Sequence, residues 1–329
     1  MNRYLYRTTT IFCLLLIAGG VNQVTLAQIK YPYAFDKTVS EPAIFGEGVI
    51  SGGSFDSHPA FAPDGKTLYF VRSTPNFNFW TILVSQFKNG KWQTPEVAPF
   101  SGEYSDADPF ITADGKKFFF ISKRPVAGKE KTDTDIWMME KTARGAWSEP
   151  QNLGAPVNSD ADEWYPTLAR NGMLYFGSER KGGKGGSDLY RSRFTDSKYQ
   201  EPENLGETVN TEFEEYEPFI APDENFLIFM ACGRKDSYGG GDIYTSYNRD
   251  GAWTRPVNLG DKINSKRQEY SPKISPDGKY FFWTSCRNFT DQPTGKRMNY
   301  PELMNQLDGV GNGLGDIYQI DVSALKLER

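Results

Sequence analysis

The feature that most constrains the fold is a unit of about 53 residues that occurs five times in the 329-residue chain. Each copy contains an acidic residue, a proline three positions later, a tight-turn sequence, and an aromatic run followed by an arginine. A period of this length is typical of propeller repeats, in which one unit alone cannot bury its apolar faces. The prolines that anchor the copies are Pro59, Pro109, Pro166, Pro218 and Pro272.

Each copy predicts a set of antiparallel strands. Turns such as Pro63-Asp64-Gly65 separate the first two strands, because proline presets φ, aspartate bonds its own backbone and glycine tolerates φ > 0. The aromatic run that follows has the length of one buried strand. No long segment has an apolar period of 3.6 residues, so we expect few helices. A third strand begins at an aspartate in four copies, namely Asp135, Asp188, Asp242 and Asp316.

A fourth element contains Asn-Leu-Gly in three copies, at 152–154, 204–206 and 258–260. The fifth copy ends before such an element, and the segment 39–50 near the N-terminus resembles it, with Pro42 and Gly46 in the corresponding places. We therefore predict an all-β chain, a five-bladed β-propeller of four-stranded antiparallel blades whose ring is closed by the N-terminal strand. An open ring would leave sheet edges unpaired. Six blades are the alternative, although the five copies leave too few residues for another blade.

The N-terminus resembles a targeting segment. Arg3 and Arg7 precede the apolar run 11–18, and Thr25-Leu26-Ala27 resembles a small-residue cleavage site. We predict a secretory signal peptide over 1–27, cleaved near Ala27, and a single propeller domain over 28–329 in the periplasm or outside the cell. The apolar run is short for a membrane span, and we expect no span in the mature chain.

Composition excludes several classes of function. The formal net charge of −5 argues against nucleic-acid binding. One histidine and three cysteines leave little room for His-rich or Cys-rich metal sites, so we expect no metal and no cofactor. The glycine-rich loops lack the spacing of phosphate-binding motifs. Cys232 and Cys286 occupy equivalent places in adjacent copies, which are too far apart for a disulfide, and we expect both thiols to be free.

Residues that occur in every copy are expected to serve the structure of every blade. The acidic residues that precede the anchor prolines are expected to form one tie per blade with the arginines that follow the aromatic runs. A ring of catalytic or metal-binding carboxylates is the alternative interpretation. The acids are Asp56, Asp106, Glu163, Glu215 and Glu269, and the arginines are Arg72, Arg124, Arg180, Arg234 and Arg287.

These recurring residues resemble the WD40-like repeats of TolB-type periplasmic propellers. The resemblance rests on the acidic residue, the proline, the Asp-Gly turn, the aromatic strand and Asp-Ile-Tyr, and it covers about residues 50–320. It implies a propeller fold and export. It implies function only weakly, because propellers carry both binding modules and enzymes.

Departures from the repeat are better candidates for function. The residues next to the anchor prolines differ between copies, and we expect them at one mouth of the central channel, where they would bind a ligand: His58, Asp108, Trp164, Tyr165, Tyr216, Glu217 and Tyr270. Two further departures are the long segment 288–315 and the aromatic segment 76–80. We interpret them as a lid or docking region on one sector of the ring, with Phe79, Trp80, Arg297 and Tyr300 as candidates.

Two classes of function follow. The leading hypothesis is a non-enzymatic exported propeller that binds an envelope protein, a peptide or a glycan, because no nucleophile motif is present. The alternative is a carbohydrate-active enzyme, a glycosidase or lyase, that uses channel carboxylates. A glycosidase needs two carboxylates about 5–9.5 Å apart. Candidates near the channel are Asp108, Asp162, Glu214 and Glu217.

Overall fold

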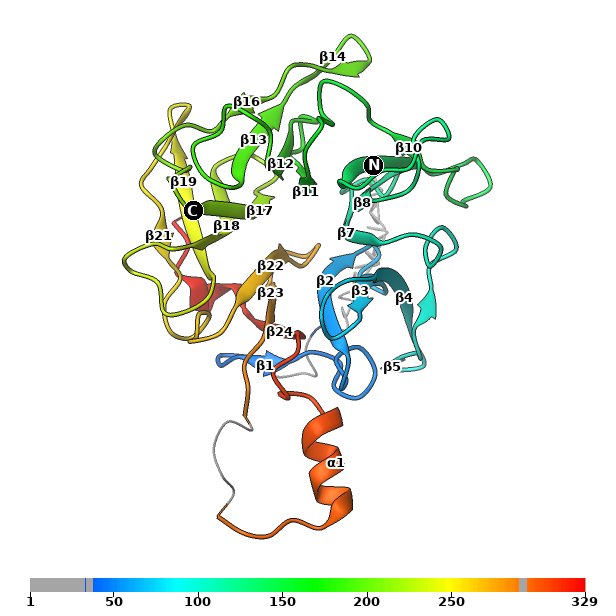
Figure 1. Cartoon of the computed structure of the whole chain (residues 1–329), viewed down its shortest axis with the longest axis vertical. Helices are drawn as coiled ribbons and strands as arrows, with labels where there is room; N and C mark the ends of the chain where they lie inside the picture. The colour runs from blue at the N-terminus through cyan, green and yellow to red at the C-terminus, as the bar shows by residue number, and fades with distance from the viewer. Residues whose placement is uncertain (1–32, 34–37, 290–294, 329) are drawn as a thin grey trace, which may run out of the picture. The chain divides into compact units, whose positions relative to one another are not determined.

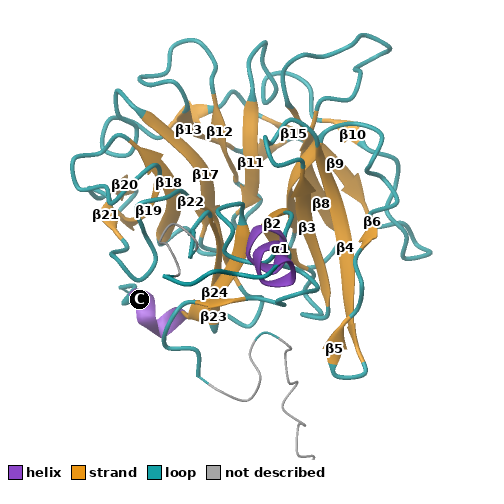
Figure 2. Ribbon diagram, turned by 60° about the horizontal axis from the view of Figure 1, so that its bottom comes forward, coloured by secondary structure: helices purple, strands orange, loops and turns teal. Residues whose placement is uncertain are grey.

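The computed structural model describes Tyr33 and residues 38–289 and 295–328. The predicted signal peptide, with Arg3, Arg7 and its cleavage site, lies outside the described residues. The regular secondary structure of the described part consists almost entirely of short antiparallel strands, joined by loops (Figure 2). Within it, no helix has the length and apolar character needed to cross a membrane.

Five antiparallel sheets surround a central axis, with β2, β7, β11, β17 and β22 innermost (Figure 1). Blade 1 contains β2 (Phe55–Phe61), β3 (Thr67–Ser73), β4 (Trp80–Lys88), β5 (Lys91–Trp92) and β6 (Glu96–Val97). Blade 2 contains β7 (Asp106–Ile111), β8 (Lys117–Ser122), β9 (Asp135–Glu140) and β10 (Gln151–Asn152). Blade 3 contains β11 (Glu163–Leu168), β12 (Leu174–Ser178), β13 (Asp188–Ser192) and β16 (Glu203–Asn204), and β14 (Phe194–Thr195) and β15 (Lys198–Tyr199) form a separate hairpin. Blade 4 contains β17 (Glu214–Ile220), β18 (Phe226–Cys232), β19 (Asp242–Arg249), β20 (Ala252–Trp253) and β21 (Val257–Asn258).

The last blade is completed by the N-terminal strand, as the repeat count predicts. Blade 5 contains β22 (Glu269–Ile274), β23 (Tyr280–Ser285) and β24 (Asp316–Asp321). Its outer strand is β1 (Ala43–Ile44), which pairs antiparallel with β24 through Ala43 with Gln319 and Ile44 with Tyr318. The five-bladed, four-stranded all-β propeller closed by this strand is confirmed.

The second strand of each blade carries the aromatic run, and neighbouring sheets cover both of its faces. Phe118, Phe119 and Phe120 are consecutive in β8 and are all fully buried. Consecutive strand residues point to opposite faces, so burial of all three means that both faces of this sheet are covered. This stacking of sheets forms the core and explains why the runs contain no polar alternation.

Each blade contains the acid–arginine pair expected from the repeat. The five acids are fully buried, and each lies beside the arginine of its own blade. The nitrogen–oxygen distances are 2.6 Å for Arg72–Asp56, 2.8 Å for Arg124–Asp106, 3.2 Å for Arg180–Glu163, 2.9 Å for Arg234–Glu215 and 3.6 Å for Arg287–Glu269. A buried carboxylate needs such a partner, because an isolated buried charge is very costly.

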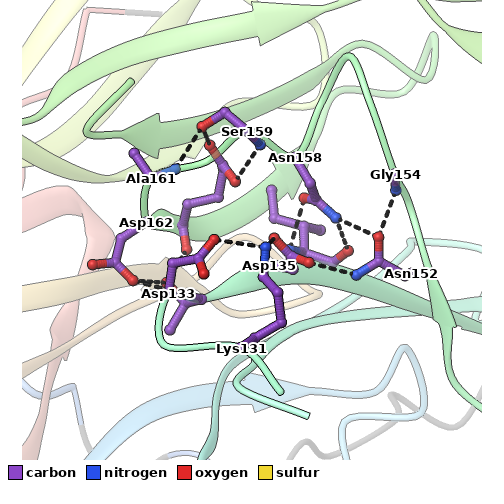
Figure 3. A network of polar contacts seen from close by, with 12 residues as sticks. Lys131, Asp133, Asp135, Asn152, Gly154, Asn158, Ser159, Ala161 and Asp162 are labelled. Carbon is purple, nitrogen blue, oxygen red and sulfur yellow. Dashed lines mark hydrogen bonds and ion pairs between the residues drawn. The ribbon is translucent and has the colours of Figure 1, made fainter. Parts of the chain in front are cut away.

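The aspartate that begins the third strand is tied to the Asn-Leu-Gly element. In blade 2, the Asn152 amide donates to the Asp135 carboxylate over 2.8 Å (Figure 3). The Asn158 side chain accepts from the Ile136 N–H and donates to the Ile136 carbonyl. Blades 3 and 4 repeat this arrangement, with Asp188 bound by Asn204 and Asp242 by Asn258, both over 2.7 Å.

The segment 288–315 differs from the plain loop that the sequence predicts. It contains α1 (Tyr300–Asp308), and the short 3₁₀ helix η1 (Val322–Leu325) follows β24. Asn299 caps α1 by accepting from the Glu302 N–H, and the Glu302 carboxylate accepts from the Asn299 N–H. This capping box is a sequence signal for a helix start that the repeat pattern does not reveal.

Candidate active site

The residue before each anchor proline has a left-handed backbone conformation. The φ values lie between 49° and 56° at His58, Asp108, Tyr165, Glu217 and Ser271. The strand register shifts at the same place in every innermost strand, which marks a β-bulge. Positive φ is uncommon for residues other than glycine, and a bulge redirects the side chain that it carries. Five equivalent positions are thereby built into the inner strands.

Three of these five positions form one ionisable cluster, which we call the floor cluster: His58, Asp108 and Glu217. The His58 Nε2 atom lies 3.0 Å from Asp108 Oδ1 and 3.1 Å from Glu217 Oε1. The three side chains come from blades 1, 2 and 4, and their exposed fractions are only 3%, 4% and 14%. The cluster therefore exists only because the ring brings distant strands together.

The remaining polar atoms of the floor cluster are held by neighbours. Ser57 Oγ lies 2.7 Å from His58 Nδ1, and the Tyr165 N–H donates to Asp108 Oδ2 over 2.8 Å. The Ser271 N–H donates to the second oxygen of Glu217. Fixed partners of this kind set the orientation of all three side chains.

Burial and the two carboxylates of the floor cluster shift the pKa values of His58 and of the nearby Lys273. Burial by itself lowers the pKa of His58, but the carboxylates of Asp108 and Glu217 outweigh it and raise that pKa to about 9. His58 is therefore protonated at neutral pH. Behind the cluster, the Lys273 Nζ atom lies 4.2 Å from the ring centre of Tyr165. Burial lowers the pKa of Lys273 to about 7, although the same two carboxylates oppose this shift.

A cavity of about 340 Å³ lies above the floor cluster. Its volume is within the range of ligand pockets, about 300–1,000 Å³. Its walls combine aromatic rings with further polar and aliphatic side chains. The lining residues are His58, Phe77, Trp80, Ala107, Asp108, Ile121, Trp164, Glu214, Tyr216, Glu217, Met230, Cys232 and Gln268.

The structure places five of the seven predicted channel residues in the wall of this cavity. They are His58, Asp108, Trp164, Tyr216 and Glu217. The other two, Tyr165 and Tyr270, are buried with 1% and 5% exposure and contact the His58 ring from beneath. The Tyr165 hydroxyl donates to the Pro272 carbonyl of blade 5, and neither tyrosine lines the cavity.

The predicted lid residues do not come together. Trp80 lines the cavity, whereas Phe79 is 42% exposed and lies outside its wall. Arg297 and Tyr300 are exposed and do not line the cavity, and α1 lies outside the ring of strands in Figure 1. The segment 288–315 does contact the chain just before β2 of blade 1, because the Asn312 amide donates to the Gly53 carbonyl over 3.1 Å.

Several lining residues were missed from the sequence. Glu214, a channel candidate from the sequence, lines the cavity, whereas Gln268, at the same position in the next copy, was missed, although aligning that position across the copies would have marked it. Lys273 follows its anchor proline, where the other copies have uncharged residues, and this departure was also visible. Cys232 lines the cavity as a free thiol, and burial raises its pKa to about 11, so the thiol is unreactive at neutral pH. Cys286 is free as well.

Comparison with known proteins gives structural similarity only. No protein-family model matches the sequence, and no curated protein sequence matches it either. The chain is similar to the α-L-arabinofuranosidase of Lactobacillus brevis, with 13% identity over 83% of this chain and 92% of that chain, at a TM-score of 0.49. It is similar to a thermostable family-43 glycoside hydrolase, with 13% identity over 84% and 91% of the two chains, at a TM-score of 0.48. It is also similar to the GH62 α-L-arabinofuranosidase domain of Coprinopsis cinerea, with 11% identity over 86% and 98%, at a TM-score of 0.47.

These three similar structures are glycoside hydrolases rather than TolB-type proteins, so the specific resemblance to TolB is not supported by them. At these identities and TM-scores the similarity carries no argument about the reaction. Function therefore has to be inferred from the residues of the cavity.

Proposed function

We propose that the protein is a carbohydrate-active enzyme that cleaves a glycosidic bond of a sugar unit held in the cavity. One observation carries this proposal: two carboxylates, Asp108 and Glu217, converge on His58 at the floor of a cavity walled by aromatic rings. Among the described residues, neither carboxylate forms an ion pair with arginine, unlike the repeated acids. This favours the second hypothesis from the sequence over a binding module.

The cavity walls suit a sugar ring. Trp80, Trp164 and Tyr216 offer flat apolar faces, while Glu214 and the floor cluster supply acceptors for hydroxyl groups. Pockets that combine aromatic walls with a few placed polar groups are typical of small-molecule sites. The aromatic faces would orient the ring above the carboxylates.

Cleavage of a glycosidic bond builds positive charge on the sugar and needs a proton on the leaving oxygen. One oxygen of Asp108 and one of Glu217 lie within 4.8 Å of each other. This is shorter than the separation of about 6.5–9.5 Å that leaves room for a water in inverting enzymes, so it favours a covalent intermediate. Asp108, the more buried of the two, would bond to the anomeric carbon as the leaving oxygen departs, and a water molecule that gives a proton to Glu217 would then displace Asp108 and release the sugar. Glu217, the more exposed, would pass a proton from His58 Nε2 to the leaving oxygen.

A neutral sugar fits the charge of the cavity better than an anionic one. Asp108, Glu214 and Glu217 carry negative charge, and His58 is the single positive residue among those that line the cavity. A carboxylated sugar would meet like charge in a partly desolvated site, which is unfavourable. Hydrolysis of a neutral glycoside is therefore favoured over lyase chemistry on uronic acids.

The test uses a panel of neutral 4-nitrophenyl glycosides, both furanosides and pyranosides, with 4-nitrophenyl glucuronide as the anionic comparison. At least one neutral glycoside should release nitrophenol. Asp108→Asn and Glu217→Gln should each lower kcat/KM by a factor of about 10²–10⁴, the usual range for loss of acid–base catalysis. Asp196→Asn, in the exposed β14–β15 turn, is the matched control.

Binding of glycans without any turnover would instead support the leading hypothesis from the sequence, an exported binding module for an envelope ligand. We also propose that the protein is exported, on the basis of the N-terminal segment. Sequencing the N-terminus of the exported protein should give a start at Gln28. Retention of Met1 in the mature protein would overturn the signal peptide.

A further inference from the structure

In the floor cluster, one polar atom of each side chain is held by an outer partner, and a second polar atom points toward the other two side chains. His58 Nδ1, one Asp108 oxygen and one Glu217 oxygen are held by Ser57, the Tyr165 N–H and the Ser271 N–H. The remaining three atoms, one nitrogen and two oxygens, all lie within 4.8 Å of one another. Ligands that are each oriented by an outer partner are a feature of metal sites in proteins.

The distances from His58 to the two carboxylates also suit a metal ion. Ligand atoms about 2.0–2.1 Å from Zn²⁺, in tetrahedral or octahedral geometry, lie roughly 2.9–3.4 Å from each other. The His58 Nε2 atom lies 3.0 Å and 3.1 Å from the two carboxylate oxygens. Glu217 is the most exposed of the three side chains, so it is the one with room to adjust.

A second observation concerns Ser271. It occupies in blade 5 the position before the anchor proline that the three cluster residues occupy in their own blades. Ser271 has the same left-handed backbone, with φ of 55°, and is fully buried. Its hydroxyl has no hydrogen-bond partner among the described residues. A buried polar group without a partner is costly, and a bound ion or its water is a common reason for one to persist.

We infer that the floor cluster is a binding site for one divalent transition-metal ion, with His58 Nε2, Asp108 Oδ1 and Glu217 Oε1 as its protein ligands. One imidazole with two carboxylates suits Zn²⁺ or Mn²⁺ better than Mg²⁺ or Ca²⁺, which prefer oxygen alone. The cavity above provides the open coordination positions. Three protein ligands with open positions are typical of catalytic rather than structural metal sites.

The expectation of no metal rested on the single histidine of the chain, but one histidine is enough when carboxylates complete the set. This inference does not depend on the proposed function, because metal binding is measured without any sugar. If both proposals hold, the ion and the shared proton compete for the same atoms. Zn²⁺ would then inhibit the metal-free cleavage that the floor cluster performs.

The test is calorimetric titration of ZnSO₄ into the full chain after treatment with a chelator. We expect one Zn²⁺ per chain. His58→Gln and Asp108→Asn should each weaken binding by at least about tenfold, and Ser57→Ala, a positioning residue, by about tenfold. Asp196→Asn removes a carboxylate in the exposed β14–β15 turn, away from the three ligand atoms, and it should bind Zn²⁺ within about twofold of the original chain.

Zinc X-ray absorption of the loaded protein provides the second measurement, because it does not require any variant to fold. We expect nitrogen and oxygen ligands at about 2.0–2.1 Å and no sulfur at about 2.3 Å. A sulfur ligand would move the site to Cys232 and overturn the inference. Absence of binding by both Zn²⁺ and Mn²⁺, or unchanged affinity in a folded His58→Gln variant, would overturn it as well.

Discussion

Two acids in the same strand have opposite roles in this protein. Asp106 and Asp108 are two residues apart in β7, and Glu215 and Glu217 are two residues apart in β17. The first of each pair is tied to an arginine of its own blade, whereas the second faces His58 across the channel. The acids that recur in every copy stabilise the blade, and those that do not recur build the cavity.

The bulge before each proline explains this division. Residues two apart in a regular strand point to the same face of the sheet. Because the strand register shifts at the residue before the proline, the second acid leaves that face and turns toward the axis. One local distortion thus separates the structural acid from the candidate functional acid.

The largest expected effect comes from breaking a structural pair. Glu215→Ala should lower the free energy of unfolding by about 3–5 kcal/mol, because it leaves the Arg234 guanidinium, which is only 12% exposed, without its carboxylate. Urea denaturation followed by circular dichroism measures this loss. A loss below about 1 kcal/mol would mean that the repeated acids do not stabilise their blades.

The second effect is a dependence of stability on pH that belongs to the floor cluster. The pKa of His58 is raised from 6.5 to about 9, so its stabilisation is fully present below pH 6.5 and is lost as pH rises toward 9. The contribution of His58 to this decline should be about 3 kcal/mol, whereas Lys273, whose pKa is lowered to about 7, contributes a change of opposite sign above pH 7. Denaturation at a series of pH values measures it.

His58→Gln is the matched control for this pH dependence and should remove the decline in stability between pH 6.5 and 9. An identical decline in the variant would show that other groups cause it. The structural acids cannot produce it, because their arginine partners stay charged throughout this range.

The third effect concerns Asp316, the aspartate that begins the third strand of blade 5. Unlike the equivalent aspartates of blades 2, 3 and 4, it has no asparagine side chain bound to its carboxylate among the described residues. In blade 5, Ile44 pairs with Tyr318, where blades 2, 3 and 4 place an asparagine opposite the corresponding residue. Asp316 therefore has no such amide, and burial raises its pKa to about 7, although the Gly311 N–H opposes this shift. Its ionisation in the folded protein costs stability as pH rises from about 4 toward 7.

Ile44→Asn should supply the missing amide and raise the free energy of unfolding at pH 8 by about 1–2 kcal/mol, the usual contribution of a hydrogen bond to a charged group. Ala43→Asn, one residue away in β1, is the control and should bring no gain. Thermal unfolding at pH 4 and pH 8 compares the two variants. Equal behaviour would mean that Asp316 finds another partner.

The smallest effect on stability is expected from the cavity acid itself. Above pH 9, where His58 is largely neutral, Glu217→Gln should change the free energy of unfolding by less than about 1 kcal/mol, because an amide oxygen still accepts from the Ser271 N–H. The same variant should lose turnover. A large loss of stability together with the loss of turnover would place Glu217 among the structural acids.

The sequence alone determined the fold, because every blade needs the same local chemistry. The anchor proline, the turn, the aromatic run and the acid–arginine pair recur at one spacing, and only stacked sheets can bury such runs on both faces. It also marked His58, Asp108 and Glu217 as departures. It missed α1, whose capping residues Asn299 and Glu302 lie outside the repeat.

Only the tertiary structure decided which departures meet. His58 and Glu217 are 159 residues apart, and no local rule brings them within hydrogen-bond distance. A residue before proline is normally extended, so the left-handed bulge that turns these side chains inward could not be predicted from the sequence. The same geometry buries Tyr165 and Tyr270 beneath the cluster. The site arises from closure of the ring, because its three groups lie on different blades and converge only at the common axis.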